Sequence, residues 1–335
     1  MNGPRQQRTR LRDVAERAFV SVTTASNALH GKAGVAEETR RRVQQVAADL
    51  GYRPSHRALT LQGSAPGPVG LLVGEALLQD FEDMPRLFGH RLLRQLSTRL
   101  AAENIAIQLI PQQQQPATEE LSALVVVGDQ PINDDWFTPG LPVIVLGQTN
   151  DHDSVVMSLT HDHEQYALEV VAHLREQGAT QLAIIRPDIA ANYSEIATSS
   201  VEAAAQGQGL SVNTYVGSFS SEQVHDLAQL SVAEGADAIF LLIPFPRAAL
   251  AGIRAAGARV PDDVLLVGRT EGAVEAETDP PVSVVSMQAV ACADLLAQAL
   301  IAVVRGADLP TTDHLPYRFL VRESSLRTRP SRSDG

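Results

Sequence analysis

Apolar residues in the first fifty positions recur at the spacing expected for three short helices. The apolar positions of the first two runs are Leu11, Val14, Ala15, Ala18, Ala25, Ala28 and Leu29. Phe19 and Val20 separate these runs, and Ser21 is placed to cap the second helix because its hydroxyl can accept a hydrogen bond from a free backbone N–H. A third run contains Thr39, Val43, Val46, Ala47 and Leu50, and Gly51 ends it. Two short helices joined by so few residues predict a helix-turn-helix.

The outward face of the second predicted helix is short and uncharged. It consists of Val22, Thr23, Thr24, Ser26 and Asn27. Such side chains suit contact with the edges of DNA bases better than they suit a solvated surface. The pattern therefore favours a helix that reads DNA.

From residue 69 onward, short apolar segments alternate with helical patterns. The predicted strands cover residues 69–73, 105–110, 123–127, 143–146, 182–185, 212–216, 238–243 and 264–267. The predicted helices cover residues 164–176, 195–206, 222–234 and 247–256, with an earlier one marked by Leu92, Leu93, Leu96 and Leu100. Apolar strands that alternate with helices are typical of an α/β fold in which helices cover parallel sheets.

A short segment connects the two parts. Pro54 opens a stretch from Ser55 to Leu61 that could form two helical turns, and Gly63 ends it. So short a helix is marginal in water. We expect it to fold only when two copies pack together on DNA.

The charge is divided unevenly along the chain. The net charge of −12 would argue against a nucleic-acid partner if it were evenly spread. Residues 1–64, however, hold 11 Lys and Arg against 5 Asp and Glu, a net +6, which leaves −18 for residues 65–335. A basic head on an acidic body concentrates the attraction to phosphates in one place. Charge alone leaves open that the four arginines between residues 5 and 12 form only a solubilising tail.

Other composition signals narrow the class of protein. Cys292 is the one cysteine and lies in an apolar helical run, so we expect a core residue and no disulfide within the chain. No apolar run approaches the roughly 20 residues that a membrane span needs, and residues 1–8 lack the apolar core of a signal peptide. We therefore expect a cytoplasmic protein with no membrane partner.

Several segments in fixed order and spacing resemble the lactose-repressor (LacI/GalR) family of bacterial transcription regulators. The segments that carry the resemblance are Leu11–Glu16, Val20–Ser21, Thr24–Ser26, Leu29–Gly31, Val35–Arg40 and Leu50–Pro54. A thinner likeness continues through Val260–Val264, Val267–Gly268, Asp279–Pro281 and Leu320–Ser324. The resemblance covers essentially the whole chain.

The resemblance implies a domain organisation. Residues 1–52 would form a three-helix, helix-turn-helix DNA-binding head, and residues 53–67 a hinge helix and linker. The remainder would form a two-lobed core like that of periplasmic binding proteins, built of parallel sheets. Its N-lobe would comprise residues 68–160 with 286–318, and its C-lobe residues 161–285 with 319–335. A small ligand would bind between the lobes, where strand ends converge.

The resemblance also assigns residues to the DNA. Val22, Thr23 and Asn27 match the family's base-reading positions. Backbone contacts would come from Thr24, Ser26, Lys32, Tyr52 and Arg57, with Arg10 as a further candidate. Leu61 matches the hinge leucine that wedges into the minor groove, and Ala58 suits the close contact between two hinge helices.

The effector site departs from the family pattern. Ala197 stands at the position of the usual arginine, Ile243–Pro244 at that of a paired asparagine or serine and aspartate, and Thr270 near that of a further aspartate. These replacements remove charges and bidentate partners for hydroxyl groups, so a usual sugar effector is not expected. The remaining polar candidates for effector binding are Asn192, Tyr193, Glu195, Arg247, Arg269 and Glu271.

Three further departures concern local structure. Phe19 stands where the family has glycine, which predicts either a strained or a relaxed turn, since that position favours a positive φ. Ala36 replaces the usual serine cap of the third helix, at a cost of about 1 kcal/mol. Only residues 112–120 connect the second and third strands, which is too short for a standard covering helix, so one face of the N-lobe could be bare or covered by a partner.

The sequence thus predicts a homodimeric transcription regulator, most simply a repressor, that binds a palindromic double-stranded operator. The alternative is a sensor or transport-type ligand-binding protein with a vestigial head. His161 and His163 could chelate a metal, but they lie in the family's crossover segment, and we expect no metal and no cofactor. Phosphate-loop and nucleophile-elbow motifs are missing, so we expect no enzyme. Operator, effector, sign of regulation and the choice between dimer and tetramer stay open.

Overall fold

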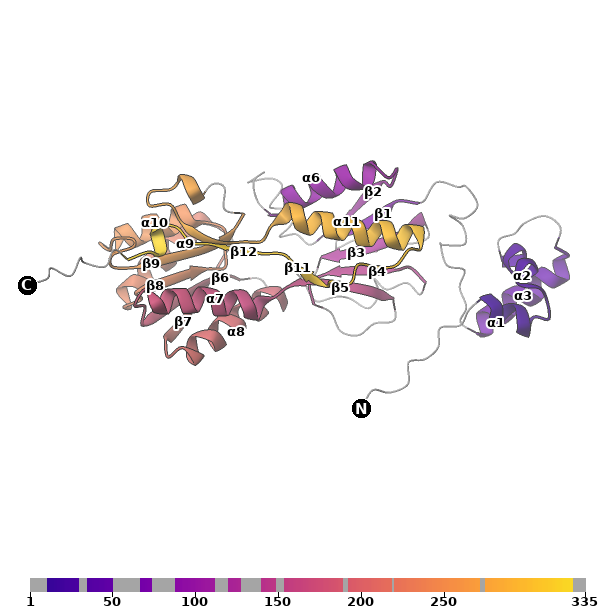
Figure 1. Ribbon diagram of the computed structural model, residues 1–335, viewed down its shortest axis with the longest axis horizontal. Coiled ribbons are helices and arrows are strands. Elements are labelled where there is room, and N and C mark those ends of the chain that lie inside the picture. Colours follow the sequence, from indigo (N-terminus) through magenta and orange to yellow (C-terminus); the bar gives the residue numbers. More distant parts are fainter. Residues whose placement is uncertain are drawn as a thin grey trace, which may run out of the picture.

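The computed structural model describes residues 11–29, 35–50, 67–73, 88–111, 120–127, 140–148, 154–188, 192–218, 220–271 and 275–327 (Figure 1). These residues form a three-helix head and two sheets, each with its own helices (Figure 1). The α/β fold class and the helix-turn-helix head are confirmed.

The head consists of α1 (Leu11–Arg17), α2 (Val22–Leu29) and α3 (Glu37–Asp49). The buried side chains at its centre are Val14, Ala15, Ala18, Ala25, Ala28, Val43 and Ala47. Every one of them is a position that the helical periodicity selected, and most are small. Small side chains let three short helices approach closely around one core.

The first sheet has the strand order β11, β5, β4, β3, β1, β2. Its strands are β11 (His314–Leu315), β5 (Val155–His161), β4 (Val143–Leu146), β3 (Ala123–Val127), β1 (Val69–Val73) and β2 (Ile107–Pro111). All neighbouring strands run parallel. The helices α6 (Phe88–Ala101) and α11 (Ala289–Arg305) lie side by side over one face (Figure 1). We call this sheet with α6 and α11 the N-lobe.

The two faces of the N-lobe sheet are packed differently. Alternate strand residues such as Leu71 and Val125 pack with α6 and α11, whereas Leu72, Leu124 and Val126 face the other way. No helix in the described ranges packs on that second face. The short connection over residues 112–120 lies almost entirely outside the described residues, so its effect on this face stays a prediction.

The second sheet has the strand order β12, β10, β9, β8, β6, β7. Its strands are β6 (Gln181–Pro187), β7 (Ser211–Gly217), β8 (Ala238–Leu241), β9 (Leu265–Thr270), β10 (Ser283–Ser286) and β12 (Arg318–Leu320). All pairs are parallel except β10 with β12. Its helices are α7 (His163–Glu176), α8 (Asn192–Gly207), α9 (Ser221–Ala233) and α10 (Pro246–Ala255). We call this unit the C-lobe.

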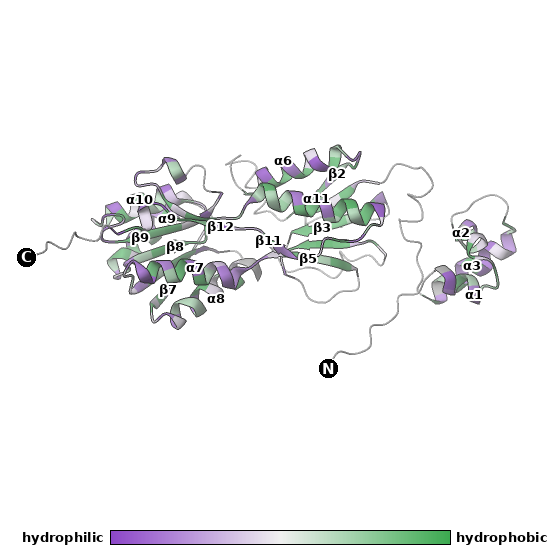
Figure 2. Cartoon of the chain, viewed as in Figure 1, coloured by the Kyte–Doolittle hydropathy of each residue, from purple (hydrophilic) through white to green (hydrophobic). Residues whose placement is uncertain are grey.

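Helices cover both faces of the C-lobe sheet. One buried cluster joins β6 and β8 to α7 and α8, and a second joins the opposite side chains of the same strands to α9 and α10. The central strands β6 and β8 are therefore largely apolar, and Figure 2 shows green strands between helices in this lobe.

The chain passes between the lobes at three places. These lie between β5 and α7, between β10 and α11, and between β11 and β12. Cys292 is buried in the first turns of α11, as expected for a core residue.

Several predicted bounds are corrected by local chemistry. The predicted strand over 105–110 begins at Ile107, because Asn104 adopts a left-handed turn and Ile105 donates its backbone N–H to the carbonyl of Leu100. The strand predicted to reach residue 243 ends at Leu241. The helix predicted from residue 195 begins at Asn192.

Candidate functional site

The start of α2 is held by Ser21. Its Oγ accepts a hydrogen bond of 3.0 Å from the backbone N–H of Thr24 and lies 2.8 Å from the hydroxyl of Thr24. The predicted N-cap is therefore confirmed. The cap fixes the direction in which α2 leaves the turn, and thus the orientation of the face that would meet DNA.

The turn before α2 contains a strained residue. Phe19 has a φ of 54°, and its side chain is 90% exposed. The backbone hydrogen bonds Phe19 N–H to Glu16 O and Val20 N–H to Ala15 O close the end of α1 around it. The sequence predicted either a strained or a relaxed turn at this position. The structure shows the strained one, because the bulky residue adopts the left-handed conformation.

Replacing Phe19 by glycine should stabilise the head. A bulky residue pays about 1–2 kcal/mol for the left-handed conformation, while glycine costs less than that in chain entropy. We expect Phe19→Gly to gain about 0.5–1 kcal/mol and to slow amide hydrogen exchange in α1 and α2. Phe19→Ala is the matched control, since it retains the Cβ atom that causes the strain. Equal exchange rates in the two variants would contradict this explanation.

Two arginines of α3 brace the other helices of the head. Arg42 donates from Nε to the carbonyl of Ala18 (3.2 Å), near the end of α1, and Arg40 donates to that of Ala28 (3.4 Å), near the end of α2. Positive charge is favourable at these carboxyl ends. Sequence reasoning did not identify this brace, because no local pattern relates residues 24 and 12 positions apart.

The outward face of α2 is available for contact. Val22 is 46% exposed, Thr23 is exposed, and Thr24 and Asn27 are partly exposed, while Ala25 and Ala28 point into the core. The backbone of Ser26 continues the helix. The other predicted DNA contacts, Arg10, Lys32, Tyr52, Arg57, Ala58 and Leu61, lie outside the described residues. The predicted base-reading side chains thus share one exposed helix face.

The predicted effector residues fall into two groups. Glu195 on α8 and Arg247 on α10 are exposed, and Asn192 and Tyr193 form the first turn of α8. Arg269 and Glu271 lie at the carboxyl end of β9, next to the passages between the lobes. Of the replaced family positions, Ala197, Ile243 and Thr270 are all buried.

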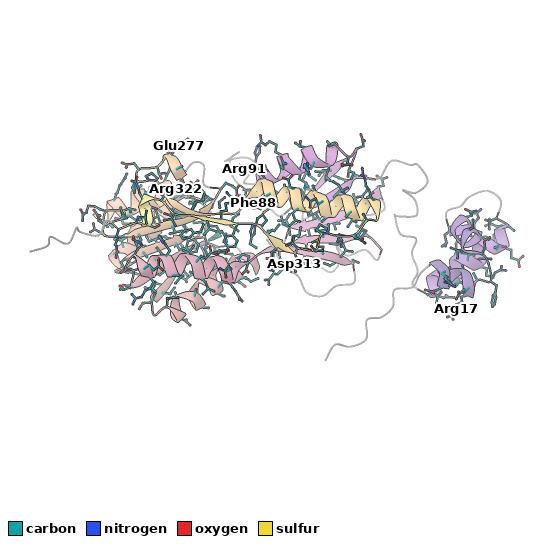
Figure 3. All side chains as sticks on the ribbon, viewed as in Figure 1. Arg17, Phe88, Arg91, Glu277, Asp313 and Arg322 are labelled. Atoms are coloured by element: carbon teal, nitrogen blue, oxygen red, sulfur yellow. The ribbon has the colours of Figure 1, made fainter. Side chains whose placement is uncertain are left out.

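Arg269 belongs to a buried network at the β5–α7 passage. It donates to the carbonyl of Leu242 (3.0 Å) and bonds to the hydroxyl of Tyr166, whose pKa is raised by burial. His163 Nδ1 lies 2.9 Å from the same hydroxyl. Phe88 packs edge-on against His161, and Figure 3 shows Phe88 and Arg91 at the end of α6 that faces the C-lobe.

Burial keeps the two histidines of this network neutral. Burial, together with the nearby charge of Arg269, lowers the pKa of His161 to about 4 and that of His163 to about 3. His161 Nε2 lies 3.2 Å from the carbonyl of Met287 and 3.6 Å from Cys292 Sγ. Among the described residues, no group of three or more His, Cys, Asp or Glu is placed to hold a metal ion. The pair is part of the lobe connection.

Family models match both parts of the chain. Residues 10–55 match the model described as bacterial regulatory proteins, lacI family, and residues 171–325 match the periplasmic binding protein-like domain. A DNA-binding head joined to a ligand-binding type of core defines a transcription regulator and not an enzyme. Residues 10–55 thus form a head of the lacI family of bacterial regulatory proteins, and they are joined to a core that matches the periplasmic binding protein-like domain.

Curated relatives agree with this assignment. The chain is 26% identical to the HTH-type transcriptional regulator MalR of Streptomyces coelicolor, over 96% of this chain and 98% of that protein. It is 24% identical to AscG of Escherichia coli, over 97% and 100%. Its match to catabolite control protein A of Staphylococcus xylosus is 26% identical over 55% of this chain and 57% of that protein.

Solved structures share the fold. The lac repressor dimer bound to operator and an anti-inducer matches with a TM-score of 0.66 and 18% identity, over 96% of this chain and all of that one. The complex of the transcriptional regulator CelR with cellobiose matches with a TM-score of 0.67 and 21% identity, over 95% and 100%. None of the helices in the described part of the chain is both long and apolar enough to cross a membrane.

Proposed function

We propose that this protein is a transcriptional repressor that binds a palindromic operator as a homodimer. The observation that carries the proposal is the exposed, N-capped face of α2 on a head that matches the lacI model. Two such heads would read adjacent major grooves, while the hinge residues Ala58 and Leu61 would pair and bend the centre of the site. A protein that binds operator DNA in a bacterium would act in the cytoplasm.

The side chains on α2 can divide the work between specificity and positioning. Asn27 can bond bidentately to an adenine edge, Val22 can meet a thymine methyl group, and Thr23 can bond to either base type. Thr24 and Ser26, with Lys32, Tyr52 and Arg57, would contact phosphates and set the register. The net charge of +6 on residues 1–64 supports this attraction.

We further propose that the core does not respond to a usual sugar effector. Ala197 is buried among apolar side chains, and Ile243 is buried in the C-lobe core, so neither supplies a group that bonds a hydroxyl. Asn192, Tyr193, Glu195, Arg247, Arg269 and Glu271 stay candidates for an atypical effector. We also propose a division of the chain into four units. Residues 1–52 form the DNA-binding head, residues 53–67 the hinge helix and linker, residues 68–160 with 286–318 the N-lobe, and residues 161–285 with 319–335 the C-lobe.

Selection from a genomic fragment library at two salt concentrations tests the operator. We expect enrichment of one palindrome and an affinity that falls steeply with salt, by roughly 10³-fold or more between 50 and 200 mM for six or more phosphate contacts. Diffuse retention with a shallow salt dependence would contradict the proposal. It would favour the alternative of a ligand-binding protein with a vestigial head.

Substitution of Asn27 should then weaken reading of that operator. We expect Asn27→Ala to lower the affinity for the enriched palindrome roughly 10- to 100-fold, because one bidentate base contact is worth about 1–3 kcal/mol. Binding to unrelated DNA should change little. Gln44→Ala, at an exposed position of α3, is the control. An equal loss in both variants, or on both DNAs, would remove Asn27 from base readout.

A further inference from the structure

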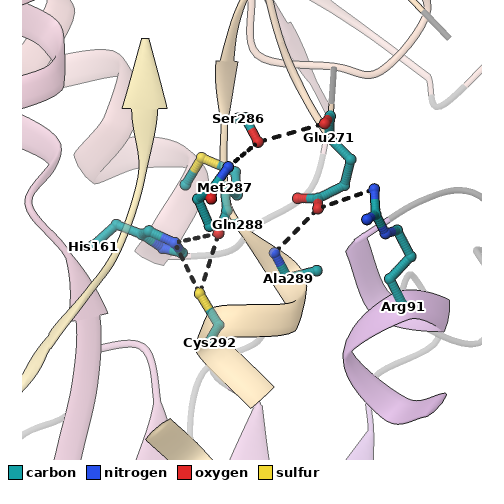
Figure 4. Close-up of polar contacts among 8 residues, drawn as sticks. All are labelled: Arg91, His161, Glu271, Ser286, Met287, Gln288, Ala289 and Cys292. Carbon is teal, nitrogen blue, oxygen red and sulfur yellow. Dashed lines mark hydrogen bonds and ion pairs between the residues drawn. The ribbon is translucent and has the colours of Figure 1, made fainter. Parts of the chain in front are cut away.

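Glu271 of the C-lobe makes its side-chain contacts across the lobe boundary. It follows β9 directly, and its side chain is only 6% exposed. Its Oε2 lies 3.6 Å from Nη1 of Arg91 on α6 and accepts a hydrogen bond of 3.1 Å from the backbone N–H of Ala289, the first residue of α11 (Figure 4). Both partners belong to N-lobe helices.

The position would be costly for a carboxylate without these partners. The second oxygen, Oε1, is buried and accepts no hydrogen bond from any described residue, and burial raises the pKa of Glu271. An unpaired buried charge is strongly unfavourable. Arg91 supplies a counter-charge, and α11, with 17 residues, presents the positive end of its dipole and a free N–H. These two groups have the chemistry of a carboxylate-binding site.

The backbone of the β10–α11 passage is tied to the same residue. Gln288 adopts a left-handed conformation with φ 52° and ψ 49°, although it is not glycine. Its Nε2 donates to Ser286 Oγ (2.8 Å), and Ser286 Oγ donates to the backbone carbonyl of Glu271 (3.4 Å). Figure 4 shows this chain of contacts beside the Glu271–Arg91 pair. Glu271 thus holds the passage through its backbone and the N-lobe through its side chain.

The other side of the passage is held independently. His161 Nε2 and Cys292 Sγ both contact the carbonyl of Met287, at 3.2 and 3.1 Å. These contacts link the passage to β5 and to α11 itself. Loss of the Glu271 contacts would therefore loosen one side of the passage without releasing the other.

We propose that Arg91 and the N-terminus of α11 form a carboxylate-binding site between the lobes, and that Glu271 fills it as a built-in ligand. The contacts of Glu271 with Arg91 and Ala289, which we call the latch, thereby hold the two lobes in one relative orientation with no small molecule bound. The latch is a property of the core alone. Only its consequence for operator affinity rests on the proposed function.

Amide hydrogen exchange of residues 286–292 in the full-length protein, without DNA, tests the latch. We expect Arg91→Met and Glu271→Gln each to raise exchange roughly tenfold, since each removes one charge of an ion pair whose carboxylate is buried. The double variant should add little, because the partners act together. Arg99→Met is the matched control. It removes another ion pair of α6, Arg99 with Asp294 at 3.2 Å, in which both residues lie in the N-lobe.

The carboxylate site has its own test. In Glu271→Ala, sodium acetate should restore the exchange protection of residues 286–292, whereas sodium chloride at the same ionic strength should not. Equal effects of the two salts would overturn the site. Additive effects of the two substitutions, or an effect of Arg99→Met as large as that of Arg91→Met, would overturn the latch. Because neither measurement uses DNA, both outcomes are independent of operator binding.

Discussion

Acidification from pH 6.5 to 4.5 should remove about 5 kcal/mol from the stability of the core. His161 and His163 are buried, with pKa values lowered to about 4 and about 3, whereas both titrate near 6.5 in the unfolded chain. Only the unfolded state then gains protons over this interval, and each pH unit costs about 1.4 kcal/mol per histidine. The stability is fully present above pH 6.5 and falls as the pH falls. The loss is comparable to the stability of a whole domain.

Urea unfolding between pH 8 and 4.5 measures this loss. The variants His161→Gln and His163→Gln should each flatten the slope of unfolding free energy against pH, whatever they cost at neutral pH. His314→Gln, at an exposed position of β11, is the control for the effect of a histidine-to-glutamine substitution as such. Glu271, whose pKa is raised, binds a proton more readily in the folded state and opposes the loss at the acid end. His173, whose pKa is also lowered by burial, would leave a smaller slope in the double variant. A slope left unchanged by replacement of both His161 and His163 would exclude them as its source.

The site of this acid sensitivity follows from the fold. His161 ends β5, His163 begins α7, and Met287 precedes α11, so the titrating groups lie where the chain passes between the lobes. The charge of Arg269 disfavours their protonation further. We therefore expect acid to loosen the connection of the lobes before it unfolds either sheet.

The head was accessible to sequence reasoning because its determinants are local. Helical periodicity selected the core residues, and a serine before an apolar run identified the cap. Phe19 at a glycine position predicted either a strained or a relaxed turn, and the structure shows the strained one. The fully apolar strands β1, β3 and β4 were equally plain, because both faces of each are buried. The strand β5 was missed, since its sequence mixes Ser158, Thr160 and His161 with apolar residues.

The contacts at the passages between the lobes could not be predicted from local sequence patterns. His161 and His163 suggested a metal pair when considered alone, and their partners Met287 and Arg269 lie more than a hundred residues away. Glu271 was predicted as an effector-binding candidate, and nothing near it in the sequence indicates its contacts with Arg91 and the N-terminus of α11. Contacts of this kind depend on how the two sheets are joined, which periodicity does not encode.

Gly252, in the middle of α10, permits a close contact between two helices of the C-lobe that a larger residue would prevent. A Cβ atom added there would lie 2.1 Å from the carbonyl oxygen of His225 on α9 and 3.1 Å from the Cβ of Ala228. The first neighbour is backbone and cannot rotate away. The two helices pack against each other over one face of the C-lobe sheet, so any side chain larger than hydrogen must push them apart.

We expect Gly252→Ala to destabilise the core by about 1–2 kcal/mol, because the cost of overpacking, about 1–3 kcal/mol, exceeds the gain of about 1 kcal/mol from alanine as the better helix former. Gly207→Ala is the matched control, because Gly207 also lies in a helix and a Cβ atom there would have no neighbour within 4 Å. That variant should be neutral or slightly more stable, so the two substitutions should shift the urea midpoint in opposite directions. Shifts of the same sign and size would mean that helix propensity, and not the contact with His225, governs both positions. A destabilised Gly252→Ala that still binds the operator normally would further show that α9 and α10 support the C-lobe without contributing to DNA reading.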